Sequence, residues 1–101
     1  MGIKLMRPSE AIVRHREALL DIARRHGVSN VRLFGSASRS EDTEGSDIDL
    51  LVDPSTDTSL LDLARIRLEA EDLTGIPFDV RTPLSLSRRF RDAILRDAIP
   101  L

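Results

Sequence analysis

Two aspartates separated by a single residue are the feature of this sequence best suited to chemistry. Asp47 and Asp49 lead into an apolar run in the stretch LFGSASRSEDTEGSDIDLLVD, residues 33–53. Side chains alternate between the two faces of a strand, so a strand over 48–53 places both carboxylates on one face. A third carboxylate, Asp79, lies in the segment PFDVR and would join them if the two strands are neighbours.

Three carboxylates on one surface repel one another and favour a bound cation. At about 5 Å and an effective dielectric of about 20, each like-charge pair costs about 3 kcal/mol, a large share of a small domain's stability. Oxygen ligands suit Mg²⁺ or Mn²⁺, and the absence of cysteine excludes a thiolate zinc site. The alternative is an ordinary turn before a strand, where Asp and Ser are common. Asp53 shares the face parity of the pair, but it precedes Pro54 and is interpreted as strand-end surface.

Gly35-Ser36 could form a phosphate site. The pair directly follows a short apolar strand, and glycine permits both a positive φ and close approach of a ligand to the backbone. If a helical turn begins at Ser36, its first amides could hold a phosphate. A tight turn that merely ends the strand is the alternative. Neither the Walker pattern nor the G-x-G-x-x-G pattern is present.

These residues must be positioned by a small set of helices and strands. Helices are predicted where apolar residues recur at three- and four-residue spacing, and strands where short apolar runs end at Gly or Pro. The expected elements are a helix over 9–26, a strand over 31–34, a loop over 36–46 with room for one helical turn, a strand over 48–53, a helix over 58–74, a strand over 77–81, and a helix capped by Ser85 or Ser87.

The two later helices have predicted inward faces. In the helix over 58–74 the inward residues would be Leu60, Leu63, Ile66, Ala70 and Leu73. In the last helix they would be Leu86, Phe90, Ala93, Ile94 and Ala98. We find no repeat or linker, so the sequence predicts one domain over residues 1–101.

Composition narrows the functional classes. The chain of 101 residues is 41% hydrophobic and 32% charged, which is typical of a globular domain. A net charge of −2 and only three aromatic residues argue against nucleic acid as the direct substrate. No apolar run approaches the roughly 20 residues of a membrane span. A chain without cysteine suits a reducing cytoplasm, which is the expected location.

The combination of motifs is more specific than any one of them. Gly35-Ser36, a polar spacer, Asp47-x-Asp49 and the later Asp79 resemble the minimal nucleotidyltransferases of the DNA-polymerase-beta-like superfamily, over nearly the whole chain. The resemblance implies an α/β (α+β) fold in which helices flank a small mixed β-sheet. It also implies a reaction, the transfer of AMP from ATP to a hydroxyl of a partner protein.

The resemblance further implies roles for individual residues. It implies that Asp47, Asp49 and Asp79 are catalytic and bind two Mg²⁺ ions, with Asp79 also assisting deprotonation of the acceptor. It implies a nucleotide-binding set formed by Gly35, Ser36, Arg39 and Ser46. The chain departs from the family at Ser40, where a second glycine is common, and this departure bears on nucleotide affinity.

Short members of such a family are commonly antitoxins. They resemble the partners of HEPN-type toxins, ribonucleases that they neutralise by adding AMP, and the resemblance therefore implies a hetero-oligomer with a toxin. Two alternatives stay open: a binding module that silences its partner by contact alone, and transfer to a small-molecule hydroxyl, which usually needs an extra domain. The three intact carboxylates favour an enzyme over the binding module.

The remaining candidates have simpler interpretations. His15 and His26 fall on the first helix or at its end, where surface or capping roles are expected. The last helix is basic, with Arg88, Arg89, Arg91 and Arg96. A solvated face is the expected interpretation of these arginines, and a docking surface for an acidic partner or for nucleotide phosphates is the alternative.

Overall fold

The computed structural model describes residues 7–39, 41–43 and 45–101. In chain order the elements are α1 (Pro8–Arg25), β1 (Ser29–Phe34), the 3₁₀ turn η1 (Ser36–Arg39), β2 (Ile48–Asp53), α2 (Leu60–Thr74), β3 (Phe78–Arg81), the 3₁₀ turn η2 (Pro83–Ser85), α3 (Arg88–Asp97) and β4 (Ile99–Pro100).

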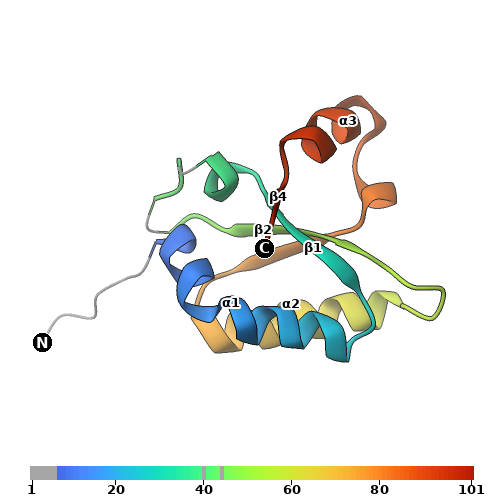
Figure 1. Cartoon of the computed structure of the whole chain (residues 1–101), viewed down its shortest axis with the longest axis horizontal. Coiled ribbons are helices and arrows are strands. Elements are labelled where there is room, and N and C mark those ends of the chain that lie inside the picture. The colour runs from blue at the N-terminus through green and yellow to red at the C-terminus, as the bar shows by residue number, and fades with distance from the viewer. Residues whose placement is uncertain (1–6, 40, 44) are drawn as a thin grey trace, which may run out of the picture.

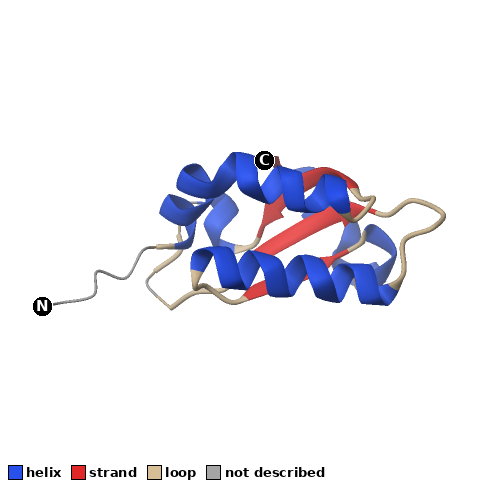
Figure 2. Ribbon diagram, turned by 90° about the horizontal axis from the view of Figure 1, so that it is seen from below, coloured by secondary structure: helices blue, strands red, loops and turns tan. Residues whose placement is uncertain are grey.

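The strands form one mixed sheet in the order β3-β2-β1-β4. β1 is antiparallel to both β2 and β4, whereas β2 and β3 run parallel. Figures 1 and 2 show α1 and α2 side by side across one face of the sheet, with α3 and η1 on the opposite side. The predicted fold class, a small mixed sheet flanked by helices, is confirmed.

The core lies between the sheet and the two long helices. Ile48, Leu50 and Val52 alternate along β2 and point to this side, where they are almost fully buried. The side chains of α2 that meet them are Ile66 and Ala70. Because side chains alternate, Asp49 and Leu51 of β2 face the other side of the sheet, where Leu51 is buried and Asp49 only partly so.

Local signals fix where the helices begin and end. Ser59 and Asp62 form a capping box at the start of α2, and Gly75 ends that helix with a φ of 74°. Such caps satisfy the backbone groups that a helix end leaves unpaired. α1 begins with Pro8 and has non-helical backbone angles at His15.

Three expectations about packing are wrong. Phe90 is 55% exposed rather than inward, and Leu60 and Leu73 are also exposed. Along α3 no residue is fully buried, because the helix projects away from the sheet instead of lying flat on it (Figure 1). Leu60 is the first residue of α2 and lies beyond the reach of the core.

The chain also contains a strand that the sequence did not predict. β4 pairs with β1 through Ile99 and Pro100, and the amide of Leu101 donates to the carbonyl of Val31 at 2.9 Å. None of the helices in the described ranges is both long and apolar enough to cross a membrane.

Candidate active site

Strand pairing brings the carboxylates together on the face of the sheet opposite α1 and α2, which we call the open face. In the parallel pair, Asp49 of β2 is the register partner of Asp79 of β3, and residues paired in this way point to the same side of the sheet. Asp47 lies one residue before β2 and is exposed, whereas Asp49 and Asp79 are partly buried. The conditional prediction that the two strands are neighbours is therefore correct.

The electrostatics of Asp49 reveal an uncompensated negative charge. Burial raises the pKa of Asp49, and the charges of Asp79 and Asp47 raise it further. Arg81 acts in the opposite direction but does not cancel them. All three predicted carboxylates thus lie within electrostatic reach of one another.

Arg81 is a component of the site that the sequence interpretation did not use. Its Nε–H donates to both carboxylate oxygens of Asp79, at 3.1 and 3.0 Å. The sequence does contain a signal for this pair, because Asp79 and Arg81 are two residues apart and residues so spaced on a strand share a face. Asp79 is consequently turned towards Arg81 in this structure.

Gly35 packs directly against Asp49. It has a φ of 75°, and a Cβ added there would overlap the Asp49 carboxylate, with its Cγ at only 3.2 Å. The turn is closed by Ser38, whose amide and hydroxyl both donate to the carbonyl of Gly35, at 3.2 and 2.7 Å. The sequence interpretation missed Ser38, although both Gly and Ser are common in turns.

The other predicted nucleotide residues lie along the same loop. Ser36 begins η1, and its carbonyl accepts from the amide of Glu41 at 2.9 Å. Arg39 pairs with Glu41 in the open, at 3.1 Å. Ser46 accepts from the amide of Thr43 at 3.1 Å and so closes a turn. Ser40 lies outside the described residues.

Asp42 anchors this loop and was also missed. It is only 4% exposed, and its Oδ2 accepts from the amide of Ser9 in the first turn of α1, at 2.9 Å. Burial raises the pKa of Asp42, but the hydrogen bonds from Ser9 and the nearby charge of Arg7 outweigh burial and hold that pKa below its ordinary value.

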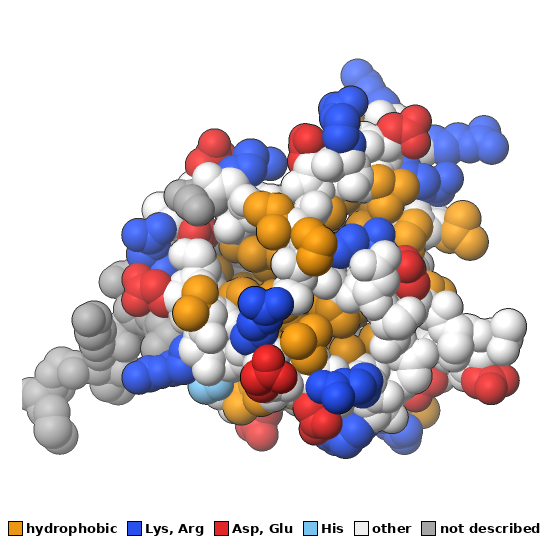
Figure 3. All heavy atoms as spheres, in the orientation of Figure 1, with side chains coloured by type: hydrophobic (Ala, Val, Ile, Leu, Met, Phe, Trp, Pro, Cys, Tyr) orange, Lys and Arg blue, Asp and Glu red, His pale blue; other side chains and the backbone are white. Residues whose placement is uncertain are grey.

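A hollow of about 230 Å³ opens between the loop and α3. It is lined from the β1–η1 side by Phe34, Gly35, Ser38 and Arg39, and from α3 by residues that include Phe90, Ile94 and Asp97. Figure 3 shows hydrophobic side chains exposed on this side of the molecule, below the basic tip formed by α3. The hollow is therefore largely apolar, with charged groups at its rim.

The sequence profile of the nucleotidyltransferase domain family matches residues 14–101. The chain belongs to this family. A provisionally named protein adenylyltransferase from Methanocaldococcus jannaschii is 41% identical over 81 residues, which cover 80% of this chain and 87% of the relative. The protein adenylyltransferase MntA from Thermococcus cleftensis is 33% identical over 79 residues, covering 78% and 80% of the two chains.

Solved structures agree with this assignment. A provisionally assigned minimal nucleotidyltransferase superposes with a TM-score of 0.83 and 44% identity, over 92% of this chain and 95% of the other. A toxin–antitoxin crystal structure with AMP-PNP superposes with a TM-score of 0.68 over 92% of this chain and 71% of the other, and its 16% identity supports the fold alone. The predicted family and enzyme class of this nucleotidyltransferase are confirmed.

The residues predicted to bind metal are all oxygen donors. In the parts of this nucleotidyltransferase that the structure describes, no group of three His, Asp or Glu side chains is arranged to hold a metal ion as it stands. The donor set nevertheless suits a hard cation, because the charge of Arg81 does not offset burial and the neighbouring carboxylates at Asp49, and carboxylate oxygens are of the type that Mg²⁺ prefers. Asp79 would need to turn from Arg81 to complete the set.

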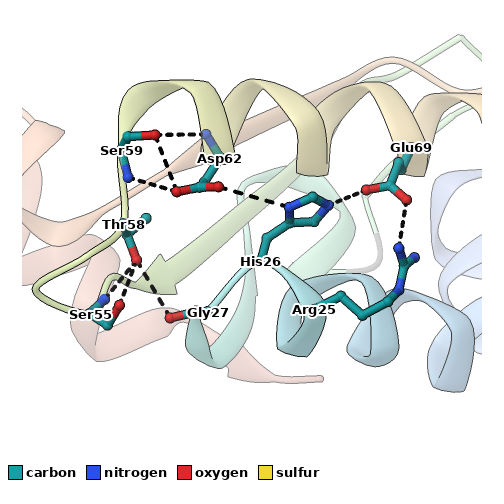
Figure 4. Close-up of polar contacts among 8 residues, drawn as sticks. All are labelled: Arg25, His26, Gly27, Ser55, Thr58, Ser59, Asp62 and Glu69. Carbon is teal, nitrogen blue, oxygen red and sulfur yellow. Dashed lines mark hydrogen bonds and ion pairs between the residues drawn. The ribbon is translucent and has the colours of Figure 1, made fainter.

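A separate polar network ties the two long helices together (Figure 4). His26, the C-cap residue of α1, lies between Asp62 and Glu69 of α2, and Arg25 contacts Glu69 at 3.0 Å. His26 thus occupies the C-cap position of α1, one of the two roles expected for it, but its side chain is bound to α2 and is not a surface group. At the end of β2, Asp53 pairs with Arg32 at 2.6 Å, so its carboxylate already has a cation partner and is not an unpaired acid of the site.

Proposed function

We propose that this nucleotidyltransferase transfers AMP from ATP to a hydroxyl of a partner protein. The observation that carries the proposal is the contact of Gly35 with Asp49, which joins the turn expected to hold phosphates to the carboxylates expected to hold metal. The names of the two relatives, both protein adenylyltransferases, support the same reaction.

The carboxylates Asp47, Asp49 and Asp79 are the residues that would hold two Mg²⁺ ions. When bound, these ions would neutralise phosphate charge and activate the attacking hydroxyl. Mg²⁺ typically takes one or two carboxylates together with substrate phosphates, which fits a site that is open on the phosphate side.

The chain's own residues would bind and orient the nucleotide. The backbone around Gly35 and Ser36 would donate N–H groups to the triphosphate. Arg39 would exchange its exposed partner Glu41 for a phosphate oxygen, since both sides of this ion pair are in solvent and little is lost by breaking it. Ser46 would support the nucleotide from the turn before Asp47.

The proposed reaction is an in-line displacement of pyrophosphate at the α-phosphorus of ATP. The acceptor oxygen forms a bond to the α-phosphorus of ATP, and the bond from that phosphorus to the oxygen of pyrophosphate breaks. The hydroxyl proton would pass to one carboxylate oxygen of Asp79, once that side chain has turned from Arg81, and then to solvent. The products are an AMP-modified protein and pyrophosphate.

The partner in this proposal is a toxin of the HEPN type. The HEPN type is what the family resemblance of the sequence implies. A neighbour that shares the fold is described as a toxin–antitoxin with AMP-PNP, and a relative is named protein adenylyltransferase MntA, which is consistent with a toxin as the partner. The chain would act as an antitoxin in the cytoplasm and form a hetero-oligomer with the toxin. The acceptor hydroxyl would then lie on the toxin and approach the open face of the sheet.

A transfer assay tests the proposal. Wild type and Asp49→Asn would be incubated with ATP radiolabelled at the α-phosphate, Mg²⁺ and a HEPN-type protein. Wild type should label the protein, and Asp49→Asn should reduce the rate by about a hundredfold or more, because several kcal/mol of transition-state charge stabilisation is lost.

The controls separate the competing functions. Asp57→Asn, an exposed carboxylate outside the site, should label at the wild-type rate. Equal labelling by wild type and Asp49→Asn would refute the catalytic role of the carboxylates. A partner that is silenced without becoming labelled would instead favour the contact-only binding module.

A further inference from the structure

The hollow beside the Gly35 turn lies on the same face of the sheet as the carboxylates. Phe34, which lines it, is the antiparallel register partner of Asp49, and side chains of paired residues point to the same side. A molecule whose phosphates lie near Gly35 and Asp49 therefore has the hollow within immediate reach.

The character of the hollow differs from that of the phosphate site. Phe34, Phe90 and Ile94 give it apolar walls, while the polar groups Arg39 and Asp97 also line it. Small-molecule sites combine apolar walls with a few polar groups in this way. At about 230 Å³ the hollow is smaller than the roughly 300 Å³ or more of sites for whole drug-sized ligands, so it suits one part of a ligand.

Phe90 is the most unusual residue of the wall. It is one of only three Phe residues in a chain without Tyr or Trp, and it is 55% exposed. The guanidinium of Arg89 lies 5.5 Å from its ring centroid. An exposed aromatic ring beside a cation is a surface on which a nucleobase stacks.

We infer that this hollow holds the nucleoside half of the nucleotide, with Phe90 stacking on the base. The inference rests on the proposed function for the presence of a nucleotide, and it assigns α3 a role in binding it. Asp97, the acidic residue of the lining, accepts a hydrogen bond from an N–H or O–H of the nucleoside. The exposure of Phe90, which is unfavourable in the empty protein, is then relieved when the base binds.

Binding titrations with two probes test this inference. Mg²⁺-ATP carries both halves of the ligand, whereas Mg²⁺-tripolyphosphate carries the phosphates alone. Phe90→Ala should weaken the binding of ATP by about five- to a hundredfold, the range expected for loss of one base–aromatic stack. The same variant should bind tripolyphosphate as wild type does, and Phe90→Tyr should retain the wild-type affinity for ATP.

A matched control lies on the same helix. Leu95 is 38% exposed and is not part of the lining, so Leu95→Ala should bind both probes as wild type does. Unchanged ATP affinity in Phe90→Ala would overturn the inference, and so would an equal loss for both probes, which would indicate a structural role. If Phe90→Ala binds ATP normally but loses its protein partner, the hollow is a docking surface and the inference is wrong.

These binding measurements contain no acceptor protein, so they separate the two proposals. A Phe90-dependent affinity for ATP combined with no AMP transfer would leave the inference standing and refute the proposed function. Normal AMP transfer combined with an ATP affinity that does not depend on Phe90 would refute the inference and leave the proposed function standing. A wild type that binds no ATP would refute both.

Discussion

Gly35 and Asp49 are packed so closely that the identity of each constrains the other. The glycine has a positive φ, and its Cβ position is filled by the Asp49 carboxylate. Gly35 thus meets two separate requirements, one conformational and one steric. The second acts on the very group that is proposed to bind metal.

Gly35→Ala tests this contact. A residue with a side chain at this φ lowers the folding free energy gain by about 1–2 kcal/mol. The added methyl group would also push the Asp49 carboxylate aside. We expect AMP transfer and Mg²⁺ binding to be lost, together with a fall in melting temperature, measured by transfer assay, titration and calorimetry.

Gly45→Ala is the control for backbone strain alone. Gly45 has a φ of +91°, but none of the atoms in the described ranges lies within 4 Å of its Cβ position. The Gly45→Ala variant should lose about as much stability as Gly35→Ala through backbone strain, but it should keep the wild-type affinity for Mg²⁺. If the two variants lose Mg²⁺ binding equally, strain rather than displacement of the carboxylate is responsible.

The arrangement of the candidate site residues, but not that of their partners, could largely be predicted from the sequence. Asp47 and Asp49 follow from strand parity, which is local information. The pairing of Asp79 with Arg81 decides which way Asp79 points, and parity alone does not state that preference. Ser38 and Asp42 went unnoticed because each acts on a backbone group that the sequence does not show.

At the scale of elements, Asp42 connects the loop between β1 and β2 to the first turn of α1. The helix N-terminus carries a partial positive charge, and the buried carboxylate accepts from the amide of Ser9 there. The loop that contains the proposed phosphate site is therefore fixed to α1 as well as to the strands at its two ends.

Asp42→Ala should destabilise the protein by about 1–2 kcal/mol, the range for loss of a helix cap. Because the folded pKa lies below the ordinary value of 3.8, the ionised carboxylate stabilises the fold fully above that value. Its contribution disappears as the pH falls through the lower folded pKa. Chemical denaturation of wild type and variant at neutral and acidic pH measures the difference.

Asp57→Ala removes an exposed carboxylate and should change stability little at either pH. A difference between Asp42→Ala and wild type that stays constant as the solution is acidified through pH 3.8 would show that the charge of Asp42 is not what stabilises α1.

The elements themselves could largely be predicted, since β2 agrees with the expected 48–53 and η1 occupies the helical turn allowed after Gly35. β4 could not, because two residues that include a proline give no strand pattern. The orientation of α3 could not either. Its apolar residues have helical spacing, but spacing does not reveal whether a partner surface exists to cover them.

At the scale of the whole molecule, the sheet has one face sealed by two helices and one face partly open. The open face carries three carboxylates, and burial together with charge repulsion raises the pKa of Asp49. The folded state therefore binds more protons than the unfolded state just above the ordinary carboxyl pKa. By linkage, stability falls as the pH rises through this window.

Asp49→Asn should accordingly be more stable than wild type at neutral pH without divalent metal. This difference in stability should shrink when the pH is lowered below the ordinary carboxyl pKa of 3.8, because Asp49 of the wild type then becomes protonated in both the folded and the unfolded state. Mg²⁺ at about a hundred times its Kd would stabilise wild type by about 2.7 kcal/mol, roughly 10 °C or more in Tm for a domain of this size.

Calorimetric scans with EDTA and with Mg²⁺ measure both effects. The variant should gain much less from Mg²⁺ than wild type does. An equal gain would indicate that the ion binds elsewhere, and a less stable variant in EDTA would contradict the repulsion argument.

The parallel pairing of β2 and β3 has a consequence for the order of events during folding. Parallel neighbours need a crossover between them, here α2, so the contact of Asp49 with Asp79 joins residues far apart in the chain. Contacts of this kind close late, because the loop entropy must be overcome first. During synthesis Gly35, Asp47 and Asp49 leave the ribosome well before Asp79, so the group of three carboxylates is complete only once the crossover through α2 has packed.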